Sequence, residues 1–307
     1  MSNIKVAMVT DWFSPRKGGV ETVVRELSTE LASRDGVAVE VLTGGFPDRL
    51  SFKERVDYMG DLKVRRLSGL VLPEFLEDVY FHPELPFKLK EIFKNEDYDV
   101  VHVHPLFTPL SAFSLTIAKQ MDPARDCVVR TNHTYKGRDL SFLRKFLYKS
   151  LVRPAEVDRI FVSSEAAKSF EEEQGADSNK IELVPLGANV KKLRPDKYSK
   201  KLREELGIGE SVFLLFVGRL VERKGLKYLF KAFNLALKSA EMELVILGGG
   251  PLEGELRKLS MQLGIDDSVQ FVGEKSESEL QRFYASCDFV VAPSVGEEAF
   301  GLVIPEA

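Results

Sequence analysis

Short apolar runs recur along the chain, and amphipathic segments separate them. The first run, Ile4–Thr10, is almost continuously apolar, and a segment with apolar residues at every third or fourth position follows it. This pattern predicts a buried strand and then a helix. Further strands are predicted at 37–43, 62–67, 98–104, 126–131, 157–163 and 181–185. Buried strands that alternate with helices are typical of a parallel sheet with helices on both faces.

The same alternation begins again after a polar stretch. Residues 186–201 are polar and charged, which indicates a linker between domains. Beyond it, strands are predicted at 212–217, 243–247, 269–272 and 289–292, with helices between them. We therefore predict an α/β protein with two Rossmann-like, doubly wound domains, at 1–189 and 190–307.

Two segments of the first half have a less regular pattern. Residues 72–87 are rich in proline and aromatic residues and are predicted to form a loop over the site. Residues 140–153 predict an amphipathic helix with a basic face, made by Arg138, Lys145, Lys149 and Arg153. A solvated face is the usual explanation, and contact with an anionic membrane surface is the alternative.

The composition excludes some classes of protein. The net charge of −4 argues against a nucleic-acid-binding protein, whose footprint is normally basic. Cys127 and Cys287 fall in different predicted domains, which indicates free thiols in a reducing compartment. No signal peptide precedes the first strand and no apolar run reaches membrane-spanning length. We expect a cytoplasmic protein.

Candidate ligand-binding residues of the first domain follow its strands. Gly18 and Gly19 lie between the first strand and its helix, where glycine permits close approach of a ligand or a positive φ, although a plain tight turn explains them equally well. His102 and His104 share one face of a strand but have no acidic or cysteine partner nearby, so histidines satisfied by hydrogen bonds are favoured over metal ligands. His133 follows a strand, where open α/β sheets bind ligands, and is the stronger candidate.

Two glycine-bounded turns follow the first two strands of the second domain. The turn from Gly218 to Gly225 carries Arg219 and Lys224, and cations there fit a bound diphosphate better than they fit packing. The turn Gly248-Gly249-Gly250 lacks the third glycine of a dinucleotide fingerprint, because position 253 is Glu. A nicotinamide-dependent enzyme is therefore disfavoured.

The last residues carry two carboxylates, Glu298 and Glu306, on either side of Phe300 and Gly301. A helix that opens near Phe300 would leave its first N–H groups free for a ligand, and Pro305 is tolerated in its first turns. The carboxylates would then suit sugar hydroxyls. On spacing alone, an acidic first turn favoured by the helix dipole is the preferred explanation.

Taken in order, these motifs resemble the signature of the retaining family-4 glycosyltransferases of GT-B fold, and most nearly of those that act on phosphatidylinositol-type lipids. The residues that carry the resemblance are Gly18–Glu21, Asn132-His133, Gly218-Arg219, Arg223–Gly225, Gly248–Pro251 and Glu298-x7-Glu306. The resemblance implies transfer of a hexose from a GDP- or UDP-sugar to a hydroxyl of a glycan or lipid, without a metal or another cofactor. It also implies an active site in the cleft between the domains.

The resemblance further implies a role for each candidate. Arg219 and Lys224 would bind the diphosphate of the donor, and Glu298 would bind hydroxyls of the transferred sugar. The other substrate contacts that it implies are His133 at the sugar, Gly18 and Gly19 at the phosphates, Glu306 at the ribose, main chain near Val272 at the base, backbone N–H groups of Phe300 and Gly301 at the sugar, and Gly249 and Gly250 in the donor site.

The family's second domain continues beyond the glutamate pair, whereas this chain stops at Ala307. We therefore expect an incomplete second domain with an open sheet edge. Two other functions stay open at this point: a nucleotide-sugar 2-epimerase of the same architecture, and a catalytically incomplete subunit that only binds nucleotide sugar.

Overall fold

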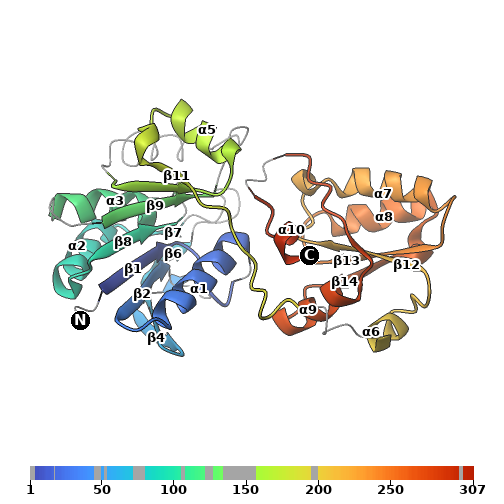
Figure 1. Ribbon diagram of the computed structural model, residues 1–307, viewed down its shortest axis with the longest axis horizontal. Coiled ribbons are helices and arrows are strands. Elements are labelled where there is room, and N and C mark those ends of the chain that lie inside the picture. Colours follow the sequence, from blue (N-terminus) through green and yellow to red (C-terminus); the bar gives the residue numbers. More distant parts are fainter. Residues whose placement is uncertain are drawn as a thin grey trace. The chain divides into compact units, whose positions relative to one another are not determined.

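The computed structural model describes residues 4–16, 18–44, 50–51, 54–71, 80–104, 108–121, 127–133, 157–194, 200–296 and 300–307 (Figure 1). The chain forms two compact units, Met1–Leu186 (unit 1) and Gly187–Ala307 (unit 2). Each unit contains a mainly parallel sheet with helices on both faces. The predicted α/β architecture of two Rossmann-like domains is confirmed.

The sheet of unit 1 has the strand order β11-β10-β9-β8-β1-β2-β5-β4. In chain order its strands are β1 (Ile4–Thr10), β2 (Val37–Gly44), β4 (Arg55–Met59), β5 (Leu62–Leu67), β8 (Val100–Val103), β9 (Cys127–Asn132), β10 (Arg159–Val162) and β11 (Ile181–Leu183). Neighbouring strands are parallel except β4 and β5. From β1 the chain builds outward to β2 on one side and, later, to β8 on the other. The crevice beside β1 and β8 is thus the switch point, where such sheets bind ligands.

The helices of unit 1 cover both faces of this sheet. Val6 and Met8 pack toward α1 (Gly19–Ala32), whereas Ala7 and Val9 pack toward the opposite face. That face is covered by α2 (Leu85–Glu96), α3 (Pro109–Met121) and α5 (Glu165–Glu173). Because successive residues of a strand point to opposite faces, a strand segment buried on both faces must be apolar, as β1 is from Val6 to Val9.

Unit 2 repeats the architecture with the strand order β14-β13-β12-β15. Its parallel strands are β12 (Val212–Val217), β13 (Met242–Leu247), β14 (Val269–Gly273) and β15 (Phe289–Val290). One face packs against α7 (Leu226–Ala236) and α8 (Glu253–Leu263), and the other against α6 (Lys200–Glu205) and α9 (Glu277–Ser286) (Figure 1). The switch point lies between β12 and β15, and the one-turn helix α10 (Val303–Glu306) follows β15.

Two segments of unit 1 have a less regular sequence pattern, at 72–87 and at 140–153. The loop predicted at 72–87 is wrong in its second part, because Tyr80–Phe81 form β7 and α2 begins at Leu85. β7 pairs with β6 (Gly69–Val71), which also pairs with β3 (Leu50–Ser51), in a small antiparallel sheet. The basic helix predicted at 140–153 lies outside the described residues, so its proposed contact with a membrane stays a prediction.

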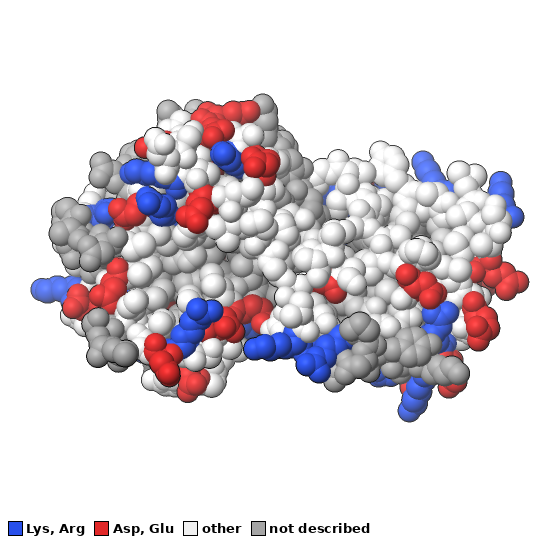
Figure 2. All heavy atoms as spheres, viewed as in Figure 1, with Lys and Arg blue, Asp and Glu red and all other residues white. Residues whose placement is uncertain are grey.

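The charged side chains and the two cysteines were considered above from the composition, and the structure shows where they lie. Figure 2 shows basic and acidic side chains interspersed over unit 1 on the face drawn. Cys127 and Cys287 are not joined by a disulfide, and burial raises the pKa of Cys287 to about 11. Within the described ranges, no helix has both the length and the apolar character needed to span a bilayer.

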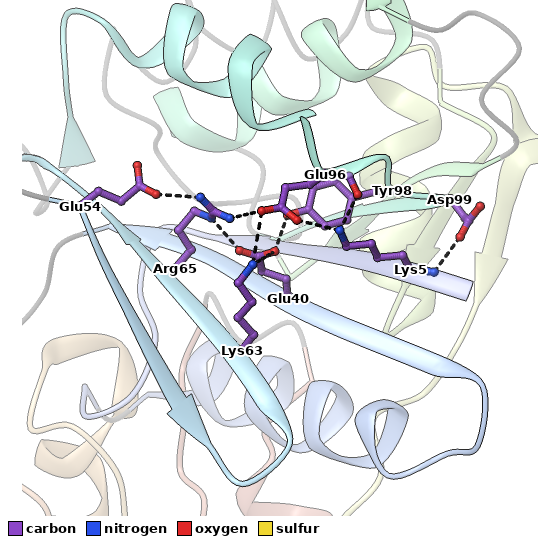
Figure 3. Close-up of polar contacts among 8 residues, drawn as sticks. All are labelled: Lys5, Glu40, Glu54, Lys63, Arg65, Glu96, Tyr98 and Asp99. Atoms are coloured by element: carbon purple, nitrogen blue, oxygen red, sulfur yellow. Dashed lines mark hydrogen bonds and ion pairs between the residues drawn. The ribbon is translucent and has the colours of Figure 1, made fainter. Parts of the chain in front are cut away.

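A charged cluster joins α2 to the sheet of unit 1 (Figure 3). Glu40 on β2 is only 2% exposed, and its carboxylate accepts hydrogen bonds from Lys63 Nζ at 3.0 Å, Arg65 Nε at 2.6 Å and Tyr98 Oη at 2.8 Å. Glu96, the last residue of α2, accepts a hydrogen bond from Lys5 Nζ at 2.7 Å and also pairs with Lys63 and Arg65. Both carboxylates therefore have several cationic partners, which the buried Glu40 requires and the half-buried Glu96 shares.

We predict that Glu96 makes unit 1 sensitive to acid. The pKa of this carboxyl is lowered from 4.5 to about 2, chiefly by the hydrogen bond from Lys5, against the opposing effect of burial. A lowered pKa means that the stabilisation is present above about pH 4.5 and is lost as the pH falls through about 2. Its size is on the order of 2 kcal/mol.

Urea unfolding followed by the fluorescence of Trp12, the chain's single tryptophan, measures this effect. The free energy of unfolding should fall between pH 5 and pH 2, and Glu96→Gln should flatten that dependence. Glu91→Gln, an exposed position on the same helix, is the control. An equally steep acid dependence in Glu96→Gln and in the parent would contradict the prediction.

Candidate active site

Backbone hydrogen bonds join the loops at the carboxyl ends of β12, β13 and β14. The N–H of Gly218 donates to the carbonyl of Leu247 at 3.0 Å, and that of Gly248 to the carbonyl of Gly273 at 2.9 Å. Leu220 N–H also donates to the Gly249 carbonyl at 2.9 Å. Hydrogen bonds between main-chain atoms therefore fix the positions of these loops relative to one another.

Two glycines of the second turn are explained by this framework. Gly248 has φ 135°, and a Cβ there would lie 2.0 Å from the carbonyl oxygen of Gly218. A Cβ on Gly250 would lie 2.6 Å from the carbonyl oxygen of Leu220. Gly249 differs, since a Cβ there would meet only Glu274, at 3.6 Å. Close loop packing thus accounts for Gly248 and Gly250, and ligand binding by Gly249 and Gly250 stays a prediction.

The turn after β12 positions its cations differently. Arg219 is exposed, whereas Lys224 is half-buried at the end of the short 3-10 helix Glu222–Lys224. Gly225 then takes a left-handed conformation with φ 69°, and a Cβ there would lie 2.1 Å from the Pro293 carbonyl oxygen. The Val295 N–H donates to the Arg223 carbonyl at 3.0 Å. The turn is therefore held against the segment that follows β15.

A cavity of about 110 Å³ opens at this switch point. Its polar or small lining residues are Lys224, Ser294 and Gly301. Its apolar lining is Phe216, Val217, Ala292, Phe300, Val303 and Ile304. The structure thus brings Lys224 together with Phe300 and Gly301, which lie more than 70 residues further along the sequence. Ser294 joins them, a residue to which sequence reasoning gave no role.

The segment after β15 corrects one expectation. The helix predicted to open near Phe300 begins instead at Val303, because Gly301 takes φ 74° and cannot be a helical residue. Pro305 does lie within the first turn of α10. Glu298 lies outside the described residues, so its role at the sugar stays a prediction.

Glu306 lies close to α9. Its Oε2 accepts a hydrogen bond of 2.8 Å from the Tyr284 hydroxyl, and burial raises the pKa of the carboxyl. A contact with ribose would have to use the remaining acceptor sites of this carboxylate. Val272, expected near the base, is half-buried and precedes Gly273, which has φ 70°. Both roles stay predictions.

The glycine turn of unit 1 also differs from one expectation. Gly18 is extended, with φ 176°, and Gly19 is the first residue of α1. A positive φ is therefore not the reason for Gly18. A Cβ there would instead lie 2.2 Å from Glu21 Oε2, so glycine leaves room for that carboxylate. Contacts of Gly18 and Gly19 with phosphates stay predictions.

Three histidines gather at the carboxyl ends of β8 and β9. His102 Nε2 lies 2.7 Å from Thr131 Oγ1, which confirms that His102 is satisfied by a hydrogen bond. His104 Nδ1 lies 3.0 Å from His133 Nε2, and the two rings stack with centroids 5.3 Å apart. Sequence reasoning missed this contact because the two residues are 29 positions apart. Among the described residues, no group of three His, Cys, Asp or Glu side chains is placed to hold a metal ion.

Burial keeps these imidazoles neutral. Desolvation lowers the pKa of His102 to about 3 and that of His133 to about 4, and it lowers the pKa of His104 well below its ordinary value. At neutral pH each ring therefore carries one N–H, and the cluster at the switch point of unit 1 offers uncharged donors and acceptors.

The sequence pattern described as Glycosyltransferase Family 4 matches residues 17–192, more than half of the chain, and the one described as Glycosyl transferases group 1 matches residues 198–307. The chain belongs to glycosyltransferase family 4. This family-4 glycosyltransferase has the GT-B fold. The sucrose-phosphate synthase of Thermosynechococcus elongatus superposes on it with a TM-score of 0.77 at 20% identity, over 99% of this chain and 78% of the other.

Named relatives of this glycosyltransferase include enzymes of lipid glycosylation. The alpha-monoglucosyldiacylglycerol synthase of Streptococcus pneumoniae is 27% identical over 96% of this chain and 67% of its own length. The GDP-mannose-dependent alpha-(1-6)-phosphatidylinositol monomannoside mannosyltransferase of Mycobacterium tuberculosis is 26% identical over 99% of this chain and 77% of its own. The resemblance noted in the sequence motifs is confirmed at the level of the family.

Proposed function

We propose that this glycosyltransferase transfers a sugar from a nucleoside-diphosphate sugar to a hydroxyl of a lipid, with retention of anomeric configuration. The observation that carries the proposal is the cavity at the switch point of unit 2, where Lys224 lies beside Gly301 and Ser294. A cation and polar groups at the carboxyl edge of a parallel sheet suit a diphosphate with its attached sugar. The names of the two relatives support a lipid acceptor.

In this proposal the residues of the chain act by binding and by stabilising charge. Lys224 faces the diphosphate and stabilises the negative charge that grows on it as the glycosidic bond breaks. Arg219, exposed on the same turn, adds a second cation. Glu298 and His133 bind hydroxyls of the transferred sugar, and main chain near Val272 meets the base. Lys224 is half-buried, and partial desolvation strengthens its interaction with the phosphates.

The function is tested with defined donors and acceptors. The protein is incubated with GDP-mannose or UDP-glucose, and with vesicles that contain phosphatidylinositol or diacylglycerol. The expected result is a labelled glycolipid from one donor, with the anomeric configuration of that donor as read by NMR of the product. Vesicles of phosphatidylcholine alone, which offers no free hydroxyl on its headgroup, are the control.

The same incubations examine the two other functions. Release of a 2-epimer without lipid product would indicate an epimerase, and nucleotide binding without any turnover would indicate a binding subunit. The relatives described above are transferases, so the comparisons give neither of these functions any support.

A further inference from the structure

The hydrogen bond between His104, which is buried, and His133, which is half-buried, raises the question of which ring donates. His104 is 1% exposed, and its Nδ1 lies 3.0 Å from Nε2 of His133. Its other ring nitrogen, Nε2, is buried and has no hydrogen-bond partner in the part of the chain that the structure describes. Because both rings are neutral, one of the two bonded nitrogens must donate and the other must accept.

Two arrangements satisfy the bond between the rings. In the first, His104 donates from Nδ1, so its orphaned Nε2 is a bare acceptor and His133 must carry its proton on Nδ1. In the second, His133 donates from Nε2, so the orphaned Nε2 of His104 carries a hydrogen that bonds to nothing. Buried N–H groups without a partner are rarer in proteins than acceptors without one, which favours the first arrangement.

We propose that His104 is a positioning residue that holds His133 in its Nδ1–H tautomer, so that His133 presents an N–H donor to the ligand. The tautomer of an imidazole is set by the hydrogen bond made at its other nitrogen. His104 is well suited to set it, because its ring is stacked on His133 at an interplanar angle of 24° and packed against His102 at a centroid distance of 4.1 Å. Neither ring of the pair can turn without disturbing its neighbour.

The consequence for the reaction rests on the proposed function, in which His133 contacts the donor sugar. A neutral imidazole N–H can donate a hydrogen bond to the oxygen of a sugar hydroxyl or of a phosphate. Because the ring is already neutral, this hydrogen bond does not depend on a protonation step near neutral pH. In the opposite tautomer His133 would present an unprotonated nitrogen, which can only accept a hydrogen bond. An ionised phosphate oxygen has no hydrogen to donate to it. His104 would thereby determine which ligand atom His133 recognises, although His104 itself touches no substrate.

The tautomer is measured directly by NMR in the unmodified protein. The chain has four histidines, so histidine-selective ¹⁵N labelling gives a simple spectrum, and substitution of each histidine in turn assigns it. Two-bond ¹H–¹⁵N correlations at pH 7 should show the protonated Nδ1 and bare Nε2 pattern for His133. A protonated Nε2 on His133 would overturn the proposal, whatever the activity.

Two matched variants test whether His104 sets the tautomer of His133. The side-chain nitrogen of asparagine falls near the place of Nδ1, whereas that of glutamine falls near the place of Nε2. His104→Asn should therefore keep the donor to His133, its tautomer and most of the activity. His104→Gln should release His133 to the other tautomer and reduce kcat about tenfold, the value of one neutral hydrogen bond. An unchanged tautomer in His104→Gln would overturn the proposal.

The readouts separate this proposal from the proposed function. Thermal unfolding followed by Trp12 fluorescence checks that both variants fold. If the tautomer changes as expected while His104→Gln transfers sugar as fast as the parent, the influence of His104 on the reaction is refuted but glycosyl transfer stands. If no donor supports transfer in the parent, the proposed function fails, and NMR still decides the tautomer.

Discussion

Replacing Lys224 with alanine should lower the rate of sugar transfer about 10²- to 10³-fold, which corresponds to roughly 3–4 kcal/mol of transition-state stabilisation. Lys224 ends a 3-10 turn that is capped by a left-handed glycine, and it lines the cavity together with Gly301. Loss of a preorganised charge at a developing oxyanion cannot be recovered by water in a partly closed site. Affinity for the nucleoside diphosphate should weaken as well.

Initial-rate kinetics and calorimetry with the nucleoside diphosphate measure the two effects. Lys231→Ala is the control, because Lys231 is an exposed lysine on α7 and is not among the residues that line the cavity. Lys224→Arg should retain part of the activity because it retains the charge. A folded Lys224→Ala protein with the nucleotide affinity of the parent would remove Lys224 from the donor site.

Replacing Glu171 with glutamine should destabilise unit 1 by about 3–5 kcal/mol. Glu171 on α5 is fully buried and binds Arg130 of β9 through both oxygens, with Nη1 to Oε1 at 2.9 Å and Nη2 to Oε2 at 2.7 Å. Arginine stays charged at every ordinary pH, so the variant would leave a buried guanidinium without its counter-charge. A loss of this size in the free energy of unfolding is large for a single substitution.

Urea unfolding followed by Trp12 fluorescence reports on unit 1, which contains that residue. Glu172→Gln, an exposed position next along the helix, should change the free energy of unfolding by less than about 0.5 kcal/mol. The double variant Arg130→Met/Glu171→Leu should recover much of the loss, because it removes both charges together. A double variant that is as unstable as Glu171→Gln would show that packing, not the unpaired charge, sets the cost.

Sequence reasoning predicted the elements that are either buried on both faces or buried along a single face. β1 and β12 are buried on both faces, and α1 and α7 have a single apolar stripe, so their patterns are unambiguous. The helix Leu85–Glu96 was missed because its first turn, with Pro86 and Phe87, belongs to a stretch whose proline and aromatic content predicts a loop. Its helix is stabilised by tertiary contacts such as that of Glu96 with Lys5, which local patterns do not reveal.

The residues of the candidate site likewise include some that sequence motifs predict and some that they do not. Lys224 and Gly301 were predicted because each lies in a motif, and the fold brings them to one cavity. Ser294 and His104 were not assigned a role, because the contacts that place them at these sites are with neighbours that are distant in sequence. The late start of α10 depends on the conformation of Gly301, which sequence alone leaves open since glycine also occurs within helices.

The glycine contacts between the loops of unit 2 bear on how variation in this protein should be interpreted. At Gly248 and Gly250 any side chain would collide with the backbone of the neighbouring turn, whether or not a ligand is bound. Intolerance to change at these two positions is therefore a signature of folding and says nothing about the choice of substrate. Gly249, one position away from both, has room for a side chain, so a laboratory library that aims to alter donor preference would begin there.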